Sequence, residues 1–396
     1  MHKDWKTCSI EDLGEINRGK SKHRPRNASI LFGGEYPFIQ TADVKKANLY
    51  ITEYSETYNE VGLAQSKLWK KGTLCITIAA NIAESAILAI DACFPDSVVG
   101  FEPYVNVADT KYVKYMMDMF KVYMQQISKG TTQDNLSLAK IRKVKFEAPN
   151  YEKQKEIARI LSTYDNLIEN NNKRIGLLEK MAENLYKEWF VRFRFPGYKN
   201  VEFEEKKPRG WQVESEDIKH LAPKNFNYEE LRILGEFVRG KNITTAQMVN
   251  GNIPVISAGL QPSGYHNEAN IFGKSLTISA SGANAGFMQY HLKDIWGADC
   301  SYFQDDELLW FVYNTLKYLQ PVISNMQCGA AQPHVYPKNI NKLCILIPTD
   351  ELISKYNDYV SPCYNEIERL VRNNQLLLKQ RDLLLPRLMS GKLEVK

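Results

Sequence analysis

Two stretches of the chain place apolar residues in alternating steps of four and three, with one asparagine near the middle of each. This spacing, held for more than four heptads, is typical of a coiled-coil seam. We predict two long helices that pair with each other, because the apolar stripe is narrow and long. Two ordinary amphipathic helices that pack on their own domains are the alternative. The first seam is Ile157, Leu161, Tyr164, Ile168, Asn171, Ile175, Leu178, Ala182, Leu185 and Trp189. The second is Tyr356, Val360, Cys363, Ile367, Leu370, Asn374, Leu377, Arg381, Leu384 and Leu388.

An antiparallel pair with Asn171 opposite Asn374 brings the two seams into register. Two buried amides can satisfy each other, and they penalise slipped registers. One layer is awkward, because Tyr164 then faces Arg381. The other central layers are apolar and pair Ile168 with Leu377, Ile175 with Leu370, and Leu178 with Ile367.

The segments that precede the two helices repeat each other in sequence. Residues 13–20 (LGEINRGK) return as 234–241 (LGEFVRGK), and the loop 130–133 (GTTQ) returns as 329–332 (GAAQ). The offset between the halves is 206 from Trp5 to Trp211, 221 from Leu13 to Leu234 and 199 from Pro149 to Pro348. Such a drifting offset indicates an old duplication with insertions in loops.

The repeat predicts an α+β chain of two duplicated α/β domains separated by two long antiparallel coiled-coil helices with pseudo-twofold symmetry. We expect this pairing to place the two domains at opposite ends of the helix pair. Short β-rich runs at 36–39, 74–78 and 98–107 suggest the strands, and helices are expected near 109–127 and 305–323. The predicted boundaries are 1–149 for domain 1, 150–195 for the first helix, 196–211 for a linker, 212–348 for domain 2 and 349–396 for the second helix.

Composition supports a folded, water-soluble chain. The 396 residues are 44% hydrophobic and 24% charged, which excludes a mostly disordered protein and favours several domains. A bilayer span needs roughly 20 apolar residues, and no stretch of that kind occurs. Because the first five residues also lack the apolar run of a signal peptide, we expect a cytoplasmic protein without membrane contact. The seven cysteines form no C-x-x-C pair and the six histidines are scattered, so neither disulfides nor a metal site is expected.

Catalytic motifs are absent or weak. The glycine-rich stretch 279–286 has the backbone amides of a phosphate cradle, but it lacks the lysine and helix of a nucleotide loop. Pro95-Asp96 followed by Asp109 and Lys111 fits a loose pattern for a magnesium nuclease, although Asp109 equally suits a helix N-cap. No methyltransferase loop is present. We therefore predict a chain with no catalytic residue, no metal and no cofactor of its own.

A nucleic-acid signal is found instead in local clusters of polar residues. The net charge of +5 is small, but five cations occur within nine residues without an acid, in a turn that contains Gly19 and Pro25. Such a turn suits phosphate contact better than core packing, although a solvated charge run is the alternative. The cations are Arg18, Lys20, Lys22, Arg24 and Arg26, and the matching turn of the second half has Arg239, Lys241 and Asn242. Candidate base-reading residues, which are also common in ordinary turns, are Thr131, Thr132, Gln133 and Gln332.

Over nearly its whole length the chain resembles the specificity subunit of type I restriction–modification enzymes. The resemblance rests on the repeated LGE tripeptides at 13–15 and 234–236, on the loop 130–133, and on the stretch 149–190. The motif Pro208-x-Gly210-Trp211 is similar to the usual entry to the second half. Within 149–190, the residues that look like the family's central conserved region are Gln154, Ile157, Ile160, Leu161, Ser162, Asp165, Ile168, Glu169, Asn171, Leu178, Glu179, Trp189 and Phe190.

The resemblance implies two target-recognition domains, each of which reads one half of a bipartite, asymmetric site on double-stranded DNA. It implies that the helices act as a spacer and as the docking surface for two methylation subunits, which carry S-adenosylmethionine. A separate restriction subunit would supply the ATP- and Mg²⁺-dependent motor. Two departures are that the second half lacks Gln-x-x-Ile before its helix, at 347–352, and has Ala330 and Ala331 where the first has Thr131 and Thr132. A coiled-coil scaffold without DNA binding and a stand-alone site-specific nuclease are the alternatives.

Overall fold

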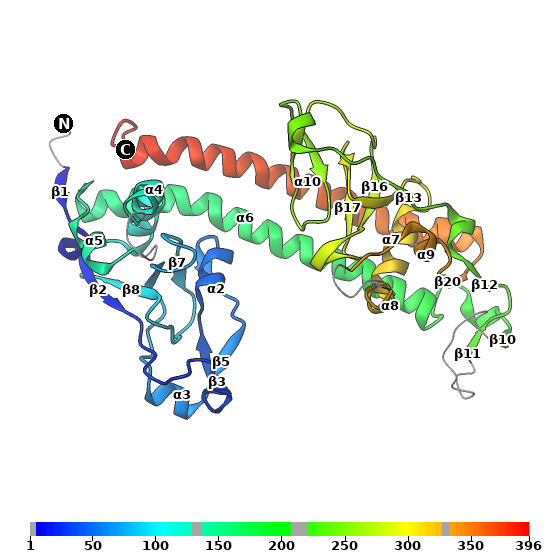
Figure 1. Cartoon of the computed structure of the whole chain (residues 1–396), viewed down its shortest axis with the longest axis horizontal. Helices are drawn as coiled ribbons and strands as arrows, with labels where there is room; N and C mark the ends of the chain where they lie inside the picture. The colour runs from blue at the N-terminus through cyan, green and yellow to red at the C-terminus, as the bar shows by residue number, and fades with distance from the viewer. Residues whose placement is uncertain (1–4, 129–135, 207–219, 327–332, 396) are drawn as a thin grey trace. The chain divides into compact units, whose positions relative to one another are not determined.

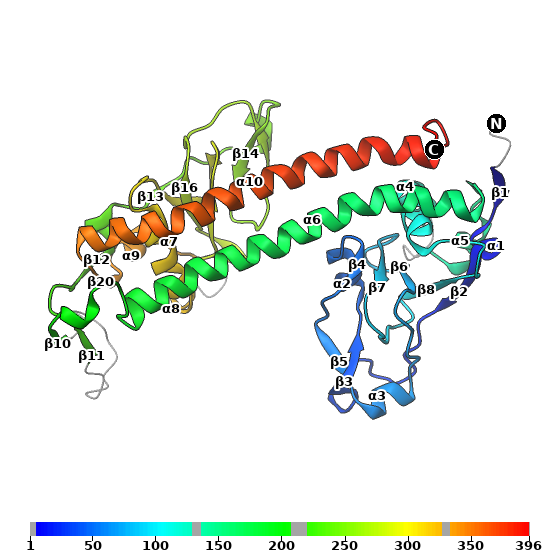
Figure 2. The same ribbon diagram turned by 180° about the vertical axis from the view of Figure 1, so that it is seen from behind.

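The computed structural model describes residues 5–128, 136–206, 220–326 and 333–395. The chain divides into two compact units (Figures 1 and 2). Unit 1 comprises Met1–Asn171 with Arg372–Lys396, and unit 2 comprises Asn172–Val371. Each unit holds one α/β domain together with one end of both long helices, α6 (Tyr151–Tyr186) and α10 (Asp350–Met389).

The domain of unit 1 is built on a five-stranded sheet of order β2-β8-β6-β7-β4. Its central strand β6 (Leu74–Thr77) is buried at all four positions, because helix α4 covers one face and an apolar layer with Trp69 and Phe94 covers the other. Strands buried on both faces form continuous apolar runs rather than alternating ones. The other elements are β1 (Lys6–Cys8), α1 (Ile10–Leu13), β2 (Gly14–Arg18), β3 (Phe32–Phe38), α2 (Thr41–Lys46), β4 (Tyr50–Ile51), β5 (Glu56–Tyr58), α3 (Glu60–Ala64), β7 (Ser85–Leu88), β8 (Val98–Pro103), α4 (Thr110–Ser128), α5 (Leu138–Lys143) and β9 (Phe146–Ala148).

The domain of unit 2 has a four-stranded sheet of order β13-β19-β16-β17 and a three-stranded sheet of order β15-β14-β18. A hairpin of β10 and β11 precedes it in the chain. Helix α7 ends where α8 begins at Gln320-Pro321, since a proline cannot donate the next helical hydrogen bond. The elements are β10 (Phe203–Lys206), β11 (His220–Pro223), β12 (Asn227–Glu230), β13 (Val238–Arg239), β14 (Ile253–Ile256), β15 (Gly264–His266), β16 (Ser275–Ser279), β17 (Met288–His291), β18 (Trp296–Gly297), β19 (Cys300–Phe303), α7 (Leu309–Tyr318), α8 (Gln320–Asn325), α9 (Pro337–Asn341) and β20 (Cys344–Ile347).

The predicted duplication is confirmed by strand pairing. Strands β2, β8, β6 and β7 of the first sheet have β13, β19, β16 and β17 as counterparts in the same order. The pair Lys6 with Ala148 in β1 and β9 corresponds to Asn227 with Ile347 in β12 and β20. The structural offset at the first strand is therefore already 221 residues. The match of Trp5 with Trp211 at an offset of 206 is wrong, because this register places Phe226 at the position of Trp5.

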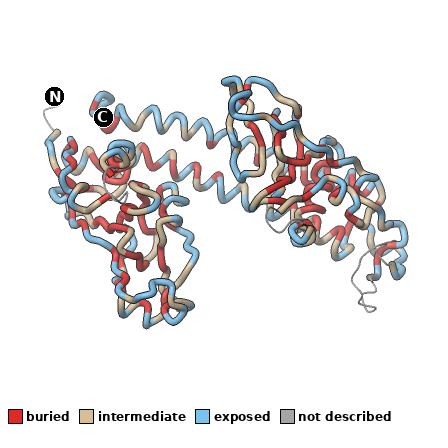
Figure 3. Tube along the Cα trace, viewed as in Figure 1, coloured by how far each residue is buried: buried red, intermediate tan, exposed pale blue. Residues whose placement is uncertain are grey.

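The two long helices run antiparallel within each unit, as predicted. In unit 1 the side-chain amide of Asn171 donates to Oδ1 of Asn374 at 2.8 Å, and both residues are buried. In unit 2 the Tyr356 hydroxyl donates to the Ala182 carbonyl at 3.1 Å. Within each unit, buried residues lie on both helices beside the domain of that unit (Figure 3). Among the other central seam residues, Ile168, Ile367 and Leu370 are buried, and Ile175, Leu178 and Leu377 are half-buried.

A buried carboxylate joins the helices to the domain of unit 1. The two oxygens of Asp165 accept hydrogen bonds from Tyr115 Oη at 2.5 Å and from Asn48 Nδ2 at 3.0 Å. Arg381 forms an ion pair with the same carboxylate. Burial and the Asp165 charge raise the pKa of Tyr115, so its hydroxyl stays protonated and donates. The awkward layer of Tyr164 and Arg381 is thus resolved, because the guanidinium turns to the neighbouring residue on α6.

Aromatic rings take this anchoring role in unit 2. Tyr364 of α10 stacks on Trp310 of α7 with ring centroids 3.7 Å apart. Its hydroxyl accepts a hydrogen bond from Asn314 Nδ2 at 2.9 Å. Tyr290 donates to Glu179 of α6 at 2.9 Å. The two domains are therefore attached to the same helices by different chemistry.

The asparagine pair gives a prediction for stability. Replacing Asn171 or Asn374 alone with leucine leaves one buried amide without its partner, which costs roughly 1–3 kcal/mol. The double replacement puts leucine against leucine in an apolar seam, and we expect it to recover much of the loss. Thermal unfolding of the four proteins of this double-mutant cycle is the measurement. Simple additivity of the two losses would contradict the energetic coupling of the pair.

Candidate nucleic-acid interface

Residues 18–26, here called the basic loop, leave the edge strand β2 of the first sheet and are held against the segment 94–98, which leads into β8. The amide of Gly19 donates to the Val98 carbonyl at 2.8 Å, and that of Lys20 to the Phe94 carbonyl at 3.0 Å. A Cβ atom on Gly19 would lie 2.2 Å from the Pro95 carbonyl oxygen. Only glycine permits this close approach of two backbones.

Further hydrogen bonds fix the rest of the basic loop. Oε1 of Gln65 accepts from the amides of Lys22 and His23 at 2.6 and 3.0 Å. The Arg24 guanidinium donates to the Ser21 and His23 carbonyls, both at 2.8 Å. The backbone is therefore rigid, and its five cationic side chains are all exposed. A rigid loop loses little conformational entropy when it binds a ligand.

Only part of this charge is available to a partner. Arg26 forms an ion pair with Asp96 at 2.6 Å. Within the described residues, the structure gives no acidic partner to Arg18, Lys20 or Lys22. Arg24 likewise has no acidic partner there, but its guanidinium donates to two carbonyls of the loop, so Arg18, Lys20 and Lys22 are the cations best placed to meet a phosphate.

The second domain builds the same turn with less free charge. The amides of Gly240 and Lys241 donate to the Cys300 and Gly297 carbonyls, both at 2.9 Å, and a Cβ on Gly240 would lie 2.5 Å from the latter oxygen. Arg239 forms an ion pair with Asp299, which leaves this turn more nearly neutral than the basic loop. The Lys241 ammonium lies 5.9 Å from the ring centroid of Trp296, and Asn242 is exposed.

Several predicted polar residues lie outside the described part of the chain. They are Thr131, Thr132, Gln133 and Gln332. The alanines that replace the two threonines in the second half, Ala330 and Ala331, and the motif residues Pro208, Gly210 and Trp211 also lie outside it. Nothing in the structure tests a role for them, and they stay predictions.

The residues of the nuclease pattern have structural partners. Asp96 pairs with Arg26, and Oδ1 of Asp109 accepts the Tyr112 amide at 3.0 Å at the start of α4. In the glycine-rich stretch, the Gly282 and Ala285 amides donate to the Pro333 and Gly282 carbonyls. The described residues contain no group of three or more histidines, cysteines, aspartates or glutamates that could hold a metal ion. In the same part of the chain, no helix has the length and apolar character needed to cross a membrane.

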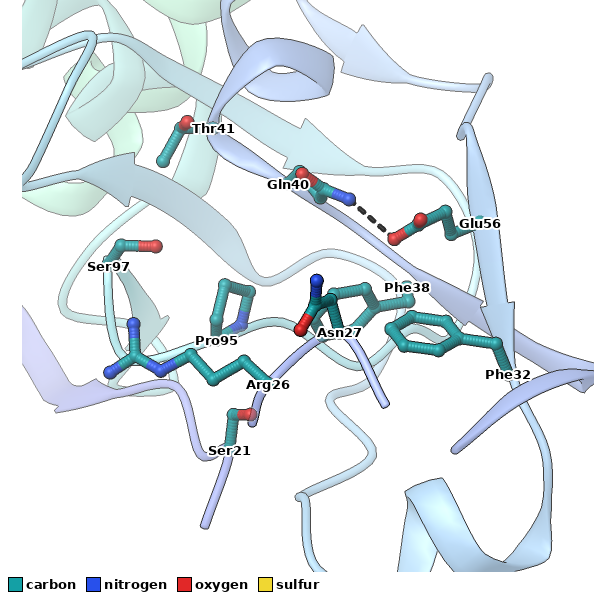
Figure 4. A pocket seen from close by; sticks show the side chains of 10 residues that line it. All are labelled: Ser21, Arg26, Asn27, Phe32, Phe38, Gln40, Thr41, Glu56, Pro95 and Ser97. Atoms are coloured by element: carbon teal, nitrogen blue, oxygen red, sulfur yellow. Dashed lines mark hydrogen bonds between the residues drawn. The ribbon is translucent and has the colours of Figure 1, made fainter. Parts of the chain in front are cut away.

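A pocket beside the basic loop was not found from the sequence. It has a volume of about 260 Å³ and is shown in Figure 4. Its walls come from three segments between residues 21 and 56 and from residues 95–97. Arg26 belongs to the basic loop and Pro95 to the loose nuclease pattern, but no motif or spacing marks the other lining residues. Only the folding of β3 and β5 against the loop brings them together.

The fold and the interface define a class of protein: a duplicated pair of α/β domains, each with a glycine-dependent basic turn, on two shared helices. The comparison with known families identifies that class. Residues 2–180 and 223–378 match the type I restriction modification DNA specificity domain, and the chain belongs to this family. It is a specificity subunit of a type I restriction–modification system, the component of such systems that is not catalytic.

Relatives of similar length support this identification. The chain is 26% identical to the type I restriction enzyme MjaIX specificity subunit of Methanocaldococcus jannaschii, over 100% of this chain and 94% of the relative. It is 22% identical to the HindI specificity subunit of Haemophilus influenzae, over 98% and 100% of the two chains. The crystal structure of the S subunit from M. genitalium has the same fold, with a TM-score of 0.60, 17% identity and coverage of 98% and 97%.

Proposed function

We propose that each domain of this chain binds one half of a bipartite, asymmetric site on double-stranded DNA. One observation carries the proposal, namely that the same glycine-dependent turn, with an arginine and a lysine on either side of the glycine, is built at equivalent edge strands of both domains. Phosphate contacts from such a turn orient a domain on the duplex, and base contacts from neighbouring loops select the sequence. The turns are alike and the surrounding loops have diverged, which suits two domains that read different half-sites.

The helices α6 and α10 set the spacing of the half-sites in this proposal and dock two methylation subunits. Exposed large apolar residues mark protein interfaces when they gather on one element. In unit 2, Leu177 and Met181 stand one turn apart on α6 and are exposed, and in unit 1 Leu376 and Leu383 of α10 are exposed. The methylation subunits would bring S-adenosylmethionine, and a restriction subunit would bring ATP and Mg²⁺. The present chain needs no cofactor for recognition alone.

A domain exchange tests this function. Residues 212–348 are replaced by the matching segment of a relative that recognises a different site, and the methylated motif is mapped in cells carrying the complete system. We expect one half-site to change and the other to stay, because the basic loop and the rest of domain 1 are untouched. The matched control replaces residues 1–149 and should change the opposite half.

Other results would contradict the proposal. A change in both halves after one exchange would show that the domains do not read independently. A motif that survives both exchanges would favour a scaffold without DNA recognition. Cutting of DNA by this purified chain with Mg²⁺ would favour a nuclease.

A further inference from the structure

The pocket of the first domain shares a wall with the basic loop. One side of the pocket is formed by the loop and the residue that follows it, and the other side by β3, β5 and the start of α2 (Figure 4). A DNA strand whose phosphates lie on Lys20 and Lys22 would therefore pass the mouth of the pocket. The lining includes Ser21, Asn27, Phe32, Phe38, Gln40 and Glu56.

Rigid aromatic rings form the apolar part of the pocket. Phe32 and Phe38 meet edge to face with ring centroids 5.9 Å apart. Tyr58 is fully buried and stacks on Phe38 at 4.0 Å, so the wall has little freedom to move. Such walls exclude water, and a hydrogen bond formed beside them is stronger than one in bulk solvent.

The polar groups of the pocket favour a ligand that donates hydrogen bonds. Glu56 places a carboxylate there, and Nε2 of Gln40 donates to its Oε2 at 2.5 Å, which orients the group. A carboxylate accepts about four hydrogen bonds, so capacity remains. Because Arg26 is neutralised by Asp96, the pocket carries the negative charge of Glu56 and disfavours a phosphate group.

A second observation also indicates a ligand. The Ser21 hydroxyl is buried and has no hydrogen-bond partner among the described residues. Buried polar groups are rarely left unpaired, because desolvation without a partner costs free energy. Ser21 lines this pocket, where a polar ring atom is the missing kind of partner. The exposed Asn27 amide at the rim offers one further donor and acceptor.

We propose that this pocket reads one base that presents an amino group in the major groove, adenine or cytosine, in the half-site bound by domain 1. Glu56 accepts a hydrogen bond from the amino group, and Gln40 holds the carboxylate in place. Carboxylates commonly accept from the amino group of cytosine, and adenine offers the same donor. The inference rests on the proposed function and adds to it a named specificity-determining residue.

The test uses the full chain assembled with its methylation subunits and a duplex carrying the mapped methylated motif. Each adenine of the domain 1 half-site is replaced in turn by purine, and each cytosine by 2-pyrimidinone, both of which lack the amino group. We expect the wild-type complex to lose about 10-fold in affinity at one position, as for one lost base contact. The Glu56→Ala complex has no acceptor at this position and should bind both duplexes of that position with equal affinity. The analogue that gives this coupling decides between adenine and cytosine.

A matched variant serves as the control. Glu35 lies on strand β3, is exposed, and does not line the pocket, so Glu35→Ala removes the same carboxylate elsewhere. Its complex should keep the wild-type response to every analogue. The inference is overturned if the wild type prefers its motif but no position responds, or if the response persists in Glu56→Ala. A wild-type complex that does not prefer the motif over a scrambled duplex would overturn the proposed function itself.

Discussion

Replacing Arg18, Lys20 and Lys22 with alanine is expected to weaken DNA binding on the order of 100-fold at physiological salt. Each phosphate contact by a cation contributes about 0.9 to the slope of log affinity against log salt concentration. Removal of three contacts should therefore lower that slope by up to about 2.7. The loop backbone is held by Gly19, Gln65 and main-chain hydrogen bonds, so the fold should survive. Binding titrations of the assembled complex at several salt concentrations provide the measurement.

Two controls make the result specific to the basic loop. Lys6, Lys143 and Lys145 are exposed and lie near the β1–β9 pair, so their replacement removes the same charge from another part of domain 1. That variant should keep the slope. Arg239→Ala in domain 2 should change the slope less than Arg18→Ala, because Asp299 already neutralises Arg239. An unchanged slope in the triple variant would remove the basic loop from the interface.

Replacing Asp165 with asparagine is expected to destabilise unit 1 by about 2–4 kcal/mol, since loss of one partner leaves the other charge uncompensated. The Asp165 side chain is 2% exposed, whereas Arg381 keeps 18%, which moderates the cost relative to a fully buried pair. The loss corresponds to a fall of roughly 5–15 °C in the melting temperature of a unit of this size. Differential scanning calorimetry measures the shift.

The same guanidinium offers a matched control. Arg381 also pairs with Asp382 at 2.9 Å, and that carboxylate is 60% exposed. An exposed pair contributes at most about 1 kcal/mol, so Asp382→Asn should have a small effect. Combining Asp165→Leu with Arg381→Met removes both charges, and it should recover part of the stability because no charge stays unpaired. Equal effects of Asp165→Asn and Asp382→Asn would show that the buried carboxylate does not anchor the domain.

In the candidate site, the sequence predicted the features that depend on neighbouring residues, whereas features that depend on residues far apart in the chain required the tertiary structure. The basic loop was found from the sequence, because its cations are neighbours in the chain. The effective charge of the basic loop and of the matching turn in domain 2 was not predicted. Asp96 and Asp299, which neutralise Arg26 and Arg239, lie 70 and 60 residues away in the chain. The pocket was not predicted from the sequence for the same reason, since Gln40 and Glu56 meet only after β3 pairs with β5.

The sequence by itself determined the two helices, the antiparallel contact of Asn171 with Asn374 and the duplication. Heptad spacing and repeated motifs are local patterns, and one amide pair selects one register. The tertiary structure decided how each domain is attached to the helices. Asp165 lies outside the apolar seam and the heptad pattern gives it no partner, yet Tyr115, Asn48 and Arg381 converge on it. At the corresponding place unit 2 stacks Tyr364 on Trp310. Long-range contacts of this kind depend on which side chains the folded domain brings together, and no spacing along the chain records that.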